Sequence, residues 1–331
     1  MLFRSDFCVG VFDDIAQDTD LGTVDRAVAL AREKGADIIV SLGGGSVMDT
    51  AKAVCVTLKN GGRADDHVAI MRLTEPQTPH IAIPTTSGTG SEVTSVSVIK
   101  SGSAGRKVYI VDSYICPNTA ILDPCFTLSL PPWLTATTAM DAMTHAVEAL
   151  TSTWANPICD GHALQAIRLI RENLPRVIAD GKDEKARNNL QIAATTAGWA
   201  FTIAQVGLAH SMAHTVGMLS NVPHGAACGI VLPAVMRFNA DHATEKLALA
   251  AQALWVQQNG MSQREMALAG ADAVENLMKE VGHPMKLSEM GVTEDVLAMA
   301  PFHAIADTAT LFNARPVSDP NEIAELYQQV F

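Results

Sequence analysis

Two separate segments carry histidines and an aspartate at spacings that suit a metal ion. His210, His214 and His224 fall within 15 residues, where the overall share of histidine, 10 of 331 residues, would place fewer than one. In the stretch MDAMTHA, Asp141 and His145 are four residues apart, which puts both side chains on one face of a helix. Their neighbours are apolar, so these side chains need a partner once they are buried. A divalent cation is one such partner, and a plain Asp–His hydrogen bond is the alternative.

The donor types indicate which metal would bind. One carboxylate with several imidazoles suits Fe²⁺ or Zn²⁺ better than Mg²⁺ or Ca²⁺, which prefer ligand sets made of oxygen alone. A site without thiolates is typical of catalysis, with one position left open. The spacing alone does not separate the roles of His210 and His214.

A glycine turn in the N-terminal half has the form of a phosphate-binding loop. The segment DIIVSL-GGGS-VMDTAKA predicts a strand, a turn of three glycines and a helix that begins at the expected cap, Ser46. Glycines let a backbone approach a ligand closely, and a helix N-terminus favours an anion such as pyrophosphate. A tight turn without a ligand is the alternative. The pattern is neither G-x-G-x-x-G nor a P-loop, so it indicates neither a standard Rossmann fingerprint nor a nucleotide triphosphatase.

A second polar turn, IPTTSGTGSE over residues 83–92, follows the next predicted strand. By itself this segment is a common loop. Ligands of open α/β sheets bind beyond the carboxyl ends of the strands, however, and two such turns after consecutive strands can face one crevice.

The elements that must position these residues differ between the two halves of the chain. Up to about residue 125, strands alternate with helices, as in a largely parallel sheet, and Gly35 ends the first helix. From Leu130 onward the strand pattern stops and alanine-rich helical patterns follow. We therefore expect an α/β domain over 1–128, an all-helical domain over 129–331 and a ligand cleft between them. The predicted strands are 37–42, 80–84, 94–99, 107–111 and 120–122. The predicted helices are 23–33, the one that runs from Ser46 toward Lys59, 133–150, 162–178, 186–208, 244–258, 263–281 and 321–330.

Composition excludes several classes of protein. With 48% apolar and 18% charged residues the chain is too apolar for disorder, and a net charge of −12 argues against nucleic acid or an anionic membrane as a partner. No run reaches the roughly 18 apolar residues of a membrane span. The six scattered cysteines are typical of reduced thiols in a cytoplasmic protein.

Taken together, five motifs resemble the iron-containing (group III) alcohol dehydrogenases in order and separation: GGGSVMDTAK, IPTTSGTGSEVT, LDPCFTLSLPP, MDAMTHAVEA and GLAHSMAHTVGMLSNVPHG. The resemblance extends over essentially the whole chain. It implies a Rossmann-like parallel-sheet dinucleotide domain followed by a helical metal-binding domain. Family members usually begin with a further strand, helix and strand, which this chain is expected to lack, so that its Rossmann-like domain is incomplete.

The resemblance also assigns roles to particular residues. His214 would be a catalytic residue that relays protons without binding the metal, and Phe201 would lie near the substrate, although packing is an alternative role for a lone phenylalanine. The implied metal ligands are Asp141, His145, His210 and His224. The implied contacts of the dinucleotide are Gly44, Gly45, Ser46, Asp49, Thr85, Thr86, Thr94 and Lys107.

The implied activity is reversible hydride transfer between a small primary alcohol or diol and its aldehyde. The cofactors would be Fe²⁺, with Zn²⁺ as the alternative, and NAD, with NADP as the alternative. We expect a cytoplasmic homo-oligomer that binds neither nucleic acid nor membrane.

Three other functions are compatible with parts of the sequence. A lyase similar to the dehydroquinate synthases would need a basic cluster near the metal, and the neighbours of Asp141 and of the 210–224 segment are Ala, Met, Val and Leu instead. A degenerate, non-catalytic paralogue would explain the expected missing segment but not the complete ligand set. A metal hydrolase would leave the glycine turn without a function.

Overall fold

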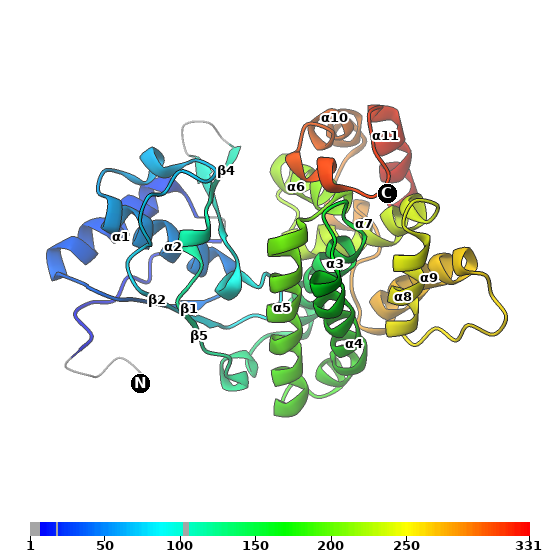
Figure 1. Cartoon of the computed structure of the whole chain (residues 1–331), viewed down its shortest axis with the longest axis horizontal. Helices are drawn as coiled ribbons and strands as arrows, with labels where there is room; N and C mark the ends of the chain where they lie inside the picture. The colour runs from blue at the N-terminus through cyan, green and yellow to red at the C-terminus, as the bar shows by residue number, and fades with distance from the viewer. Residues whose placement is uncertain (1–6, 18, 102–105) are drawn as a thin grey trace. The chain divides into compact units, whose positions relative to one another are not determined.

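The computed structural model describes residues 7–17, 19–101 and 106–331 (Figure 1). The chain forms two compact units. Unit 1 consists of Met1–Thr86 and Ser91–Phe126, and unit 2 consists of Ser87–Gly90 and Thr127–Phe331. The predicted fold class, a Rossmann-like α/β domain followed by a helical domain, is confirmed.

Unit 1 contains a parallel sheet in the order β1-β2-β5 and a separate antiparallel pair, β3-β4. The parallel register runs from Ile39 opposite His80 to Gly43 opposite Pro84, so β1 and β2 end at the same edge. The elements of this unit are α1 (Leu21–Lys34), β1 (Ile39–Gly43), α2 (Gly45–Asn60), η1 (Ala64–His67), β2 (His80–Pro84), η2 (Ser91–Val93), β3 (Val96–Ser101), β4 (Arg106–Val111), η3 (Ser113–Ile115) and β5 (Thr119–Ala120).

Local chemistry sets the limits of α1 and the core beneath it. The side chain of Asp20 accepts a hydrogen bond from the Thr23 amide at the start of the helix, and Gly35 ends the helix with φ of 64°. Val24 and Val28 face inward and belong to an apolar cluster with residues of α2, β3 and β4. The amphipathic pattern therefore predicted this helix and its end at Gly35, while its first turn begins two residues before the predicted range of 23–33.

Unit 2 is helical and surrounds α3. Every residue of α3 from Ala139 to Thr151 is buried, and α4, α5 and α7 pack against this helix (Figure 1). The elements are α3 (Pro132–Thr151), α4 (Pro157–Ala179), α5 (Glu184–Ala204), α6 (Leu208–Ser220), α7 (His224–Asn239), α8 (Thr244–Ala253), α9 (Gln263–Glu280), η5 (Ser288–Met290), α10 (Glu294–Ala304), η6 (Thr308–Phe312) and α11 (Pro320–Gln329), with η4 (Pro124–Thr127) before α3.

Several element boundaries differ from the sequence prediction: the helix predicted over 244–258 ends at Ala253, and the one predicted over 162–178 begins at Pro157. Two further differences bear on the sites. The helix predicted over 186–208 ends at Ala204, because Gln205 takes a positive φ of 66° that stops it, and α6 begins at Leu208. The predicted cap Ser46 lies inside the first turn of α2, and the N-cap residue is Gly44, which has no side chain to cap the helix. The start of α2 thus remains open to a ligand.

The second polar turn is held by contacts of its glycines with helices of unit 2. A Cβ atom on Gly88 would lie 2.9 Å from the Thr138 carbonyl oxygen on α3, and one on Gly90 would lie 2.7 Å from the Gly198 Cα on α5. Gly90 also has φ of +62°, which L side chains rarely adopt. These two glycines are therefore required by packing, whatever ligand the turn contacts.

Two further observations concern the chemistry of the whole chain. All six cysteines lie in the described part of the chain, and none of them forms a disulfide. Among the described residues, no single helix has both the length and the apolar composition of a membrane span, and only α5 and α6 taken together, bent by 105°, meet these criteria.

The contact at Gly90 predicts a specific loss of stability. Gly90→Ala combines a strained φ with an overlap against α5, so we expect the free energy of unfolding of unit 2 to fall by about 2–4 kcal/mol. Gly282→Ala is the matched control, because Gly282 has φ of +69° but nothing within 4 Å of its added Cβ. The control should lose only about 1–2 kcal/mol. Thermal unfolding of the full chain measures both, and equal losses would show that the overlap with α5 does not exist.

Candidate functional site

Three helices of unit 2 bring one carboxylate and three imidazoles together. Asp141 and His145 lie on α3, His210 lies on α6 and His224 is the first residue of α7. One potential ligand atom from each of the four side chains lies within 4.8 Å of all the others. The Nε2 atoms of the three histidines, in chain order, are 3.9, 3.8 and 3.4 Å from Asp141 Oδ1. Donors bound to one ion at about 2.0–2.2 Å lie at similar mutual separations, so the cluster has the dimensions of a metal site.

Two glycines on α7 let this helix cross α3 closely enough for the cluster to form. A Cβ on Gly225 would collide with the carbonyl oxygen of Thr137, and a Cβ on Gly229 would lie 3.1 Å from Met140 Cβ. Because α7 approaches α3 at these positions, His224 at its first turn reaches Asp141. Sequence periodicity placed the first two donors on one helix face but contained no information about this crossing.

The chemical state of the imidazoles fits a metal ion. Burial lowers the pKa of His145 to about 3 and lowers that of His210 well below its ordinary value, so both rings are neutral at pH 7. Within the described residues the buried His210 Nε2 has no hydrogen-bond partner, and it lies 3.8 Å from Asp141 Oδ1. A buried lone pair of this kind needs a partner, and a cation supplies one.

His214 lies beside the cluster rather than in it. Its ring stacks on that of His224, with centroids 5.4 Å apart and planes at 16°. His214 Nδ1 forms a 2.8 Å hydrogen bond with Asp307 Oδ2. Burial raises the pKa of Asp307, but hydrogen bonds from His214 and from the Ala309 amide outweigh this effect and hold the pKa below its usual value. Sequence analysis missed Asp307, which is 93 residues from His214 in the chain and belongs to no local pattern.

Phe201 packs directly on a residue of the cluster. Its ring stacks on His145, with centroids 4.3 Å apart and planes at 19°. Phe201 is half-buried at the C-terminal end of α5. It also packs against the main apolar core of unit 2, so it contacts both that core and the ligand cluster.

In unit 1 the two polar turns adjoin each other at the carboxyl ends of β1 and β2. The Thr85 amide donates to the Gly43 carbonyl over 3.0 Å, and a Cβ on Gly44 would lie 3.3 Å from the Thr86 side chain. Gly44, Gly45, Thr85 and Thr86 are all only half-buried. Together with the uncapped start of α2, they form the kind of site where open α/β sheets bind phosphates.

Other sequence-predicted contacts of the dinucleotide are already bonded inside unit 1. Asp49 accepts hydrogen bonds from the Ser91 hydroxyl (2.6 Å) and from the Val98 amide (3.0 Å). Thr94 is 1% exposed, and its hydroxyl accepts a 2.9 Å hydrogen bond from Lys52. Both side chains thus fasten the segment after β2 to α2.

Lys52 is a buried cation that sequence analysis did not single out. Its ammonium donates to the hydroxyls of Ser91 and Thr94 and to the carbonyl of Val96, over 2.8–2.9 Å. The position of a lysine in a helical sequence does not distinguish a buried side chain from an exposed one, so this role could not be predicted from local patterns. Lys107, by contrast, is half-buried on β4 opposite Lys100.

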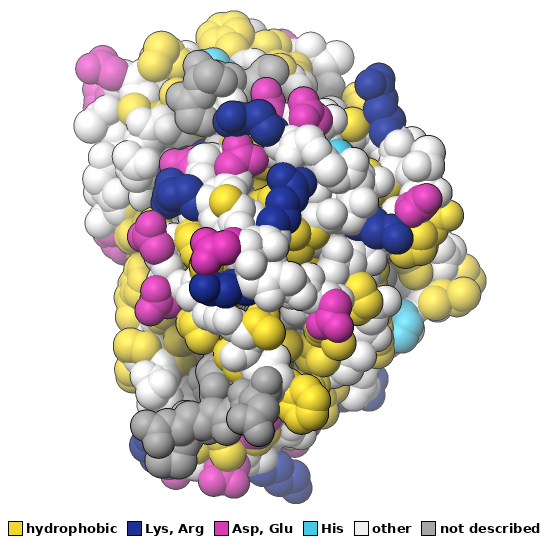
Figure 2. Space-filling model, turned by 90° about the vertical axis from the view of Figure 1, so that its left-hand side faces the viewer, with side chains coloured by type: hydrophobic (Ala, Val, Ile, Leu, Met, Phe, Trp, Pro, Cys, Tyr) yellow, Lys and Arg dark blue, Asp and Glu magenta, His cyan; other side chains and the backbone are white. Residues whose placement is uncertain are grey.

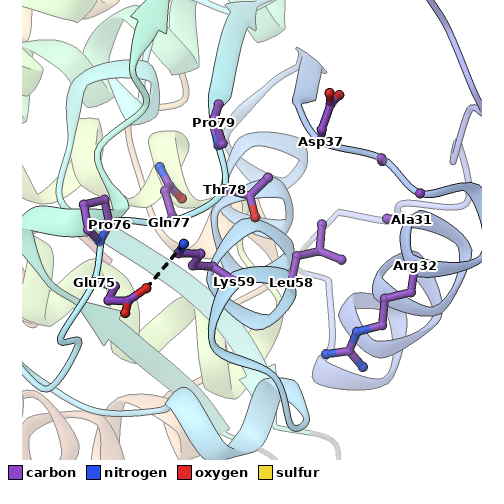
Figure 3. Close-up of a pocket in the computed structure, with 12 residues that line it drawn as sticks. Ala31, Arg32, Asp37, Leu58, Lys59, Glu75, Pro76, Gln77, Thr78 and Pro79 are labelled. Atoms are coloured by element: carbon purple, nitrogen blue, oxygen red, sulfur yellow. Dashed lines mark ion pairs between the residues drawn. The ribbon is translucent and has the colours of Figure 1, made fainter.

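A cavity of about 510 Å³ in unit 1 lies at the opposite edge of the parallel sheet. Its lining includes Asp37 and Pro79, which precede β1 and β2, and the ion pair between Lys59 and Glu75 at 3.3 Å (Figure 3). Because open α/β sheets bind ligands at the carboxyl ends of their strands, we do not assign the dinucleotide to this cavity.

Two family models match the chain, and together they cover most of it. The model described as "Iron-containing alcohol dehydrogenase" matches residues 3–124, and the one described as "Fe-containing alcohol dehydrogenase family, C-terminal" matches residues 135–331. The chain belongs to the iron-containing alcohol dehydrogenase family. The cluster of Asp141 and three histidines lies within the part matched by the C-terminal model.

Relatives of this iron-containing alcohol dehydrogenase are similar over nearly its full length. It is 36% identical over 318 residues to the NAD-dependent methanol dehydrogenase of Bacillus methanolicus (96% of this chain, 83% of the relative). It is 38% identical over 323 residues to the 1,3-propanediol dehydrogenase of Citrobacter freundii (98% and 83%). The crystal structure of a 1,3-propanediol oxidoreductase superposes with a TM-score of 0.95 at 36% identity, covering 97% of this chain and 84% of that one.

The close crossing of α3 and α7 predicts that an added methyl group at Gly225 disrupts the cluster. Gly225→Ala should force the helices apart, at a cost of about 1–3 kcal/mol, and move His224 away from Asp141. We therefore expect a lower iron content per chain than in the wild type, measured by elemental analysis after anaerobic loading. The control is Gly217→Ala on α6, whose added Cβ would make only an ordinary contact, 3.4 Å from the Val222 carbonyl. Equal iron contents in the two variants would contradict the prediction.

Proposed function

We propose that this protein is a metal-dependent, NAD-linked alcohol dehydrogenase that interconverts a small primary alcohol or diol and its aldehyde. The observation that carries the proposal is the convergence of three buried residues, Asp141, His145 and His210, with the half-buried His224, whose ligand atoms lie within 4.8 Å of one another. The relatives named for methanol and for 1,3-propanediol support a small, weakly charged substrate.

In this proposal Asp141, His145, His210 and His224 hold the metal ion, with Fe²⁺ as the resident metal and Zn²⁺ as the alternative that the same donors accept. When bound, the metal would supply a Lewis acid that lowers the pKa of an alcohol hydroxyl, and NAD would supply the hydride acceptor. The complete ligand set favours this activity over a degenerate paralogue.

His214 is the proposed proton relay. Asp307 accepts a hydrogen bond at Nδ1 of this ring, which leaves Nε2 as the atom that takes the substrate proton and passes it on. Its stacking on His224 keeps the ring next to the ligand cluster. Phe201 covers one face of His145, and in this proposal it also forms an apolar wall for the substrate.

The dinucleotide is proposed to bind the domain over 1–128, and the domain over 129–331 binds metal and substrate. Gly44, Gly45 and Ser46 would receive the pyrophosphate at the start of α2, with Thr85, Thr86 and Lys107 as further contacts of the dinucleotide. Asp49 and Thr94 would support the dinucleotide site indirectly, because their hydrogen bonds hold the segment around η2 against α2.

We also propose that the protein is a cytoplasmic homo-oligomer without nucleic-acid or membrane partners. The net charge of −12 disfavours anionic partners, and the six cysteines, none of them in a disulfide, fit a reducing compartment. On the face seen from the side of α1, the basic and acidic side chains of the described residues are interspersed (Figure 2).

The proposal is tested by removing and restoring the metal. Chelation should abolish NAD⁺ reduction, followed by absorbance with ethanol, 1,3-propanediol and butanol at high pH, because the alcohol hydroxyl then loses its Lewis acid. Adding Fe²⁺ without oxygen should restore the rate. Unchanged activity after elemental analysis has verified removal of the metal would refute the proposed mechanism.

Replacing His214 separates the relay from the ligands. His214→Ala should retain the metal but lower kcat by about 10²–10⁴-fold, because the proton loses its acceptor. The control is His303→Ala, which removes an exposed histidine of α10 and should leave kcat unchanged. If His214→Ala loses its metal instead, His214 is a ligand and the assignment of His210 or His224 is wrong.

A further inference from the structure

Glu148 lies one turn beyond His145 on α3 and connects that helix to the start of α6. It is buried, with 3% of its surface exposed. Its Oε2 accepts a hydrogen bond from the Gly207 amide (2.9 Å) and lies in hydrogen-bond contact with His210 Nδ1 (2.6 Å). Its Oε1 accepts a hydrogen bond from the Ala209 amide (2.5 Å). One carboxylate therefore binds both the backbone at the N-terminus of α6 and the histidine that α6 contributes to the cluster.

A glycine at the start of α6 leaves room for the Glu148 carboxylate. The N-cap of α6 is Gly207, and a Cβ there would lie only 3.1 Å from Glu148 Oε1 and 3.2 Å from Asn313 Oδ1. Asn313 Oδ1 makes a longer contact, 3.5 Å, with the Leu208 amide. Side chains from other elements thus accept hydrogen bonds from the first amides of α6. A larger residue at the N-cap would collide with the carboxylate.

The contact with His210 determines which nitrogen of that ring carries the proton. Both oxygens of Glu148 accept hydrogen bonds from backbone amides, which favour the ionised carboxylate, and an ionised carboxylate at Nδ1 requires an N–H there. The neutral ring then has its lone pair on Nε2, the atom that lies 3.8 Å from Asp141 Oδ1. A carboxylate in this position also fixes the rotation of the ring.

We propose that Glu148 is a positioning residue that fixes the tautomer and orientation of His210 for metal binding. The inference rests on the proposed function, because it takes His210 as a metal ligand. A purely structural role, in which Glu148 only caps α6, is the competing explanation. The two explanations predict different results for a variant that weakens the capping of α6 without affecting His210. The positioning role predicts unchanged metal affinity, and the capping role predicts a loss.

Two variants separate the explanations. In Glu148→Gln the side chain keeps its shape, but one of its two acceptor oxygens becomes an NH₂ group, which can only donate. Its neighbours are the amides of Gly207 and Ala209, which also donate, and His210 Nδ1. Where that NH₂ faces His210 Nδ1, the ring proton moves to Nε2 and blocks the atom that binds the metal. Asn313→Ala is the matched control, because it removes an acceptor from the start of α6 but Asn313 makes no hydrogen bond to His210.

The experiment titrates the metal-free full chain with Co²⁺, whose visible absorption bands report binding, in competition with a chelator. We expect the dissociation constant of Glu148→Gln to rise by about 10–100-fold and that of Asn313→Ala to stay at the wild-type value. Thermal unfolding of the metal-free proteins shows how far each variant weakens the fold. Wild-type affinity in Glu148→Gln, or an equal loss in both variants, would overturn the inference and leave the metal site itself intact.

A second measurement covers the case in which Glu148→Gln does not fold. Nitrogen NMR of the histidine rings in the metal-free wild type, with His210→Ala used to assign the signal, identifies the tautomer directly. A proton on Nδ1 of His210 supports the inference, and a proton on Nε2 overturns it. If the wild type binds no Co²⁺, or if His210→Ala binds it as tightly as the wild type, the proposed metal site is wrong, and this inference falls with it.

Discussion

The structure of unit 2 depends on placing a carboxylate and three imidazoles, of which only His224 is partly exposed, in an apolar helical interior. Polar groups lose their water on burial, and this cost is recovered only when partners are close and well oriented. Asp141 and His210 are each 2% exposed, so solvent cannot serve as that partner. A shared cation is the partner that fits all four donors at once, and it requires α3, α6 and α7 to meet within side-chain reach.

This requirement explains features of the fold that are not themselves ligands. Gly225 and Gly229 allow α7 to cross α3 closely, and Gly207 makes room for a buried carboxylate at the start of α6. The rings near the cluster also have further contacts: Phe201 stacks on His145, and Glu148 binds His210. Side chains held at two points lose little additional freedom when a metal binds, which favours affinity.

In unit 1 the proposed dinucleotide site is formed by the backbone more than by side chains. The register of β1 and β2 ends both strands at one edge, and the turns that follow them carry the glycines and hydroxyls of the proposed dinucleotide site. Lys52 and Asp49 hold the next segment to α2 from inside, through hydrogen bonds to residues of the 91–98 segment. The proposed binding surface can therefore consist of backbone amides and small side chains, because buried charges behind it supply the rigidity.

The sequence by itself determined what depends on neighbours along the chain. Periodicity and turn chemistry gave the fold class, the amphipathic α1 ended by Gly35, and the pairing of Asp141 with His145 on one face of α3. The tertiary structure decided what depends on helix crossings and burial: that His210 and His224 reach Asp141, that Glu148 and Asp307 each hold an imidazole, and that Lys52 is fully buried. These contacts join residues 39 to 93 positions apart, and local patterns carry no information about such distances.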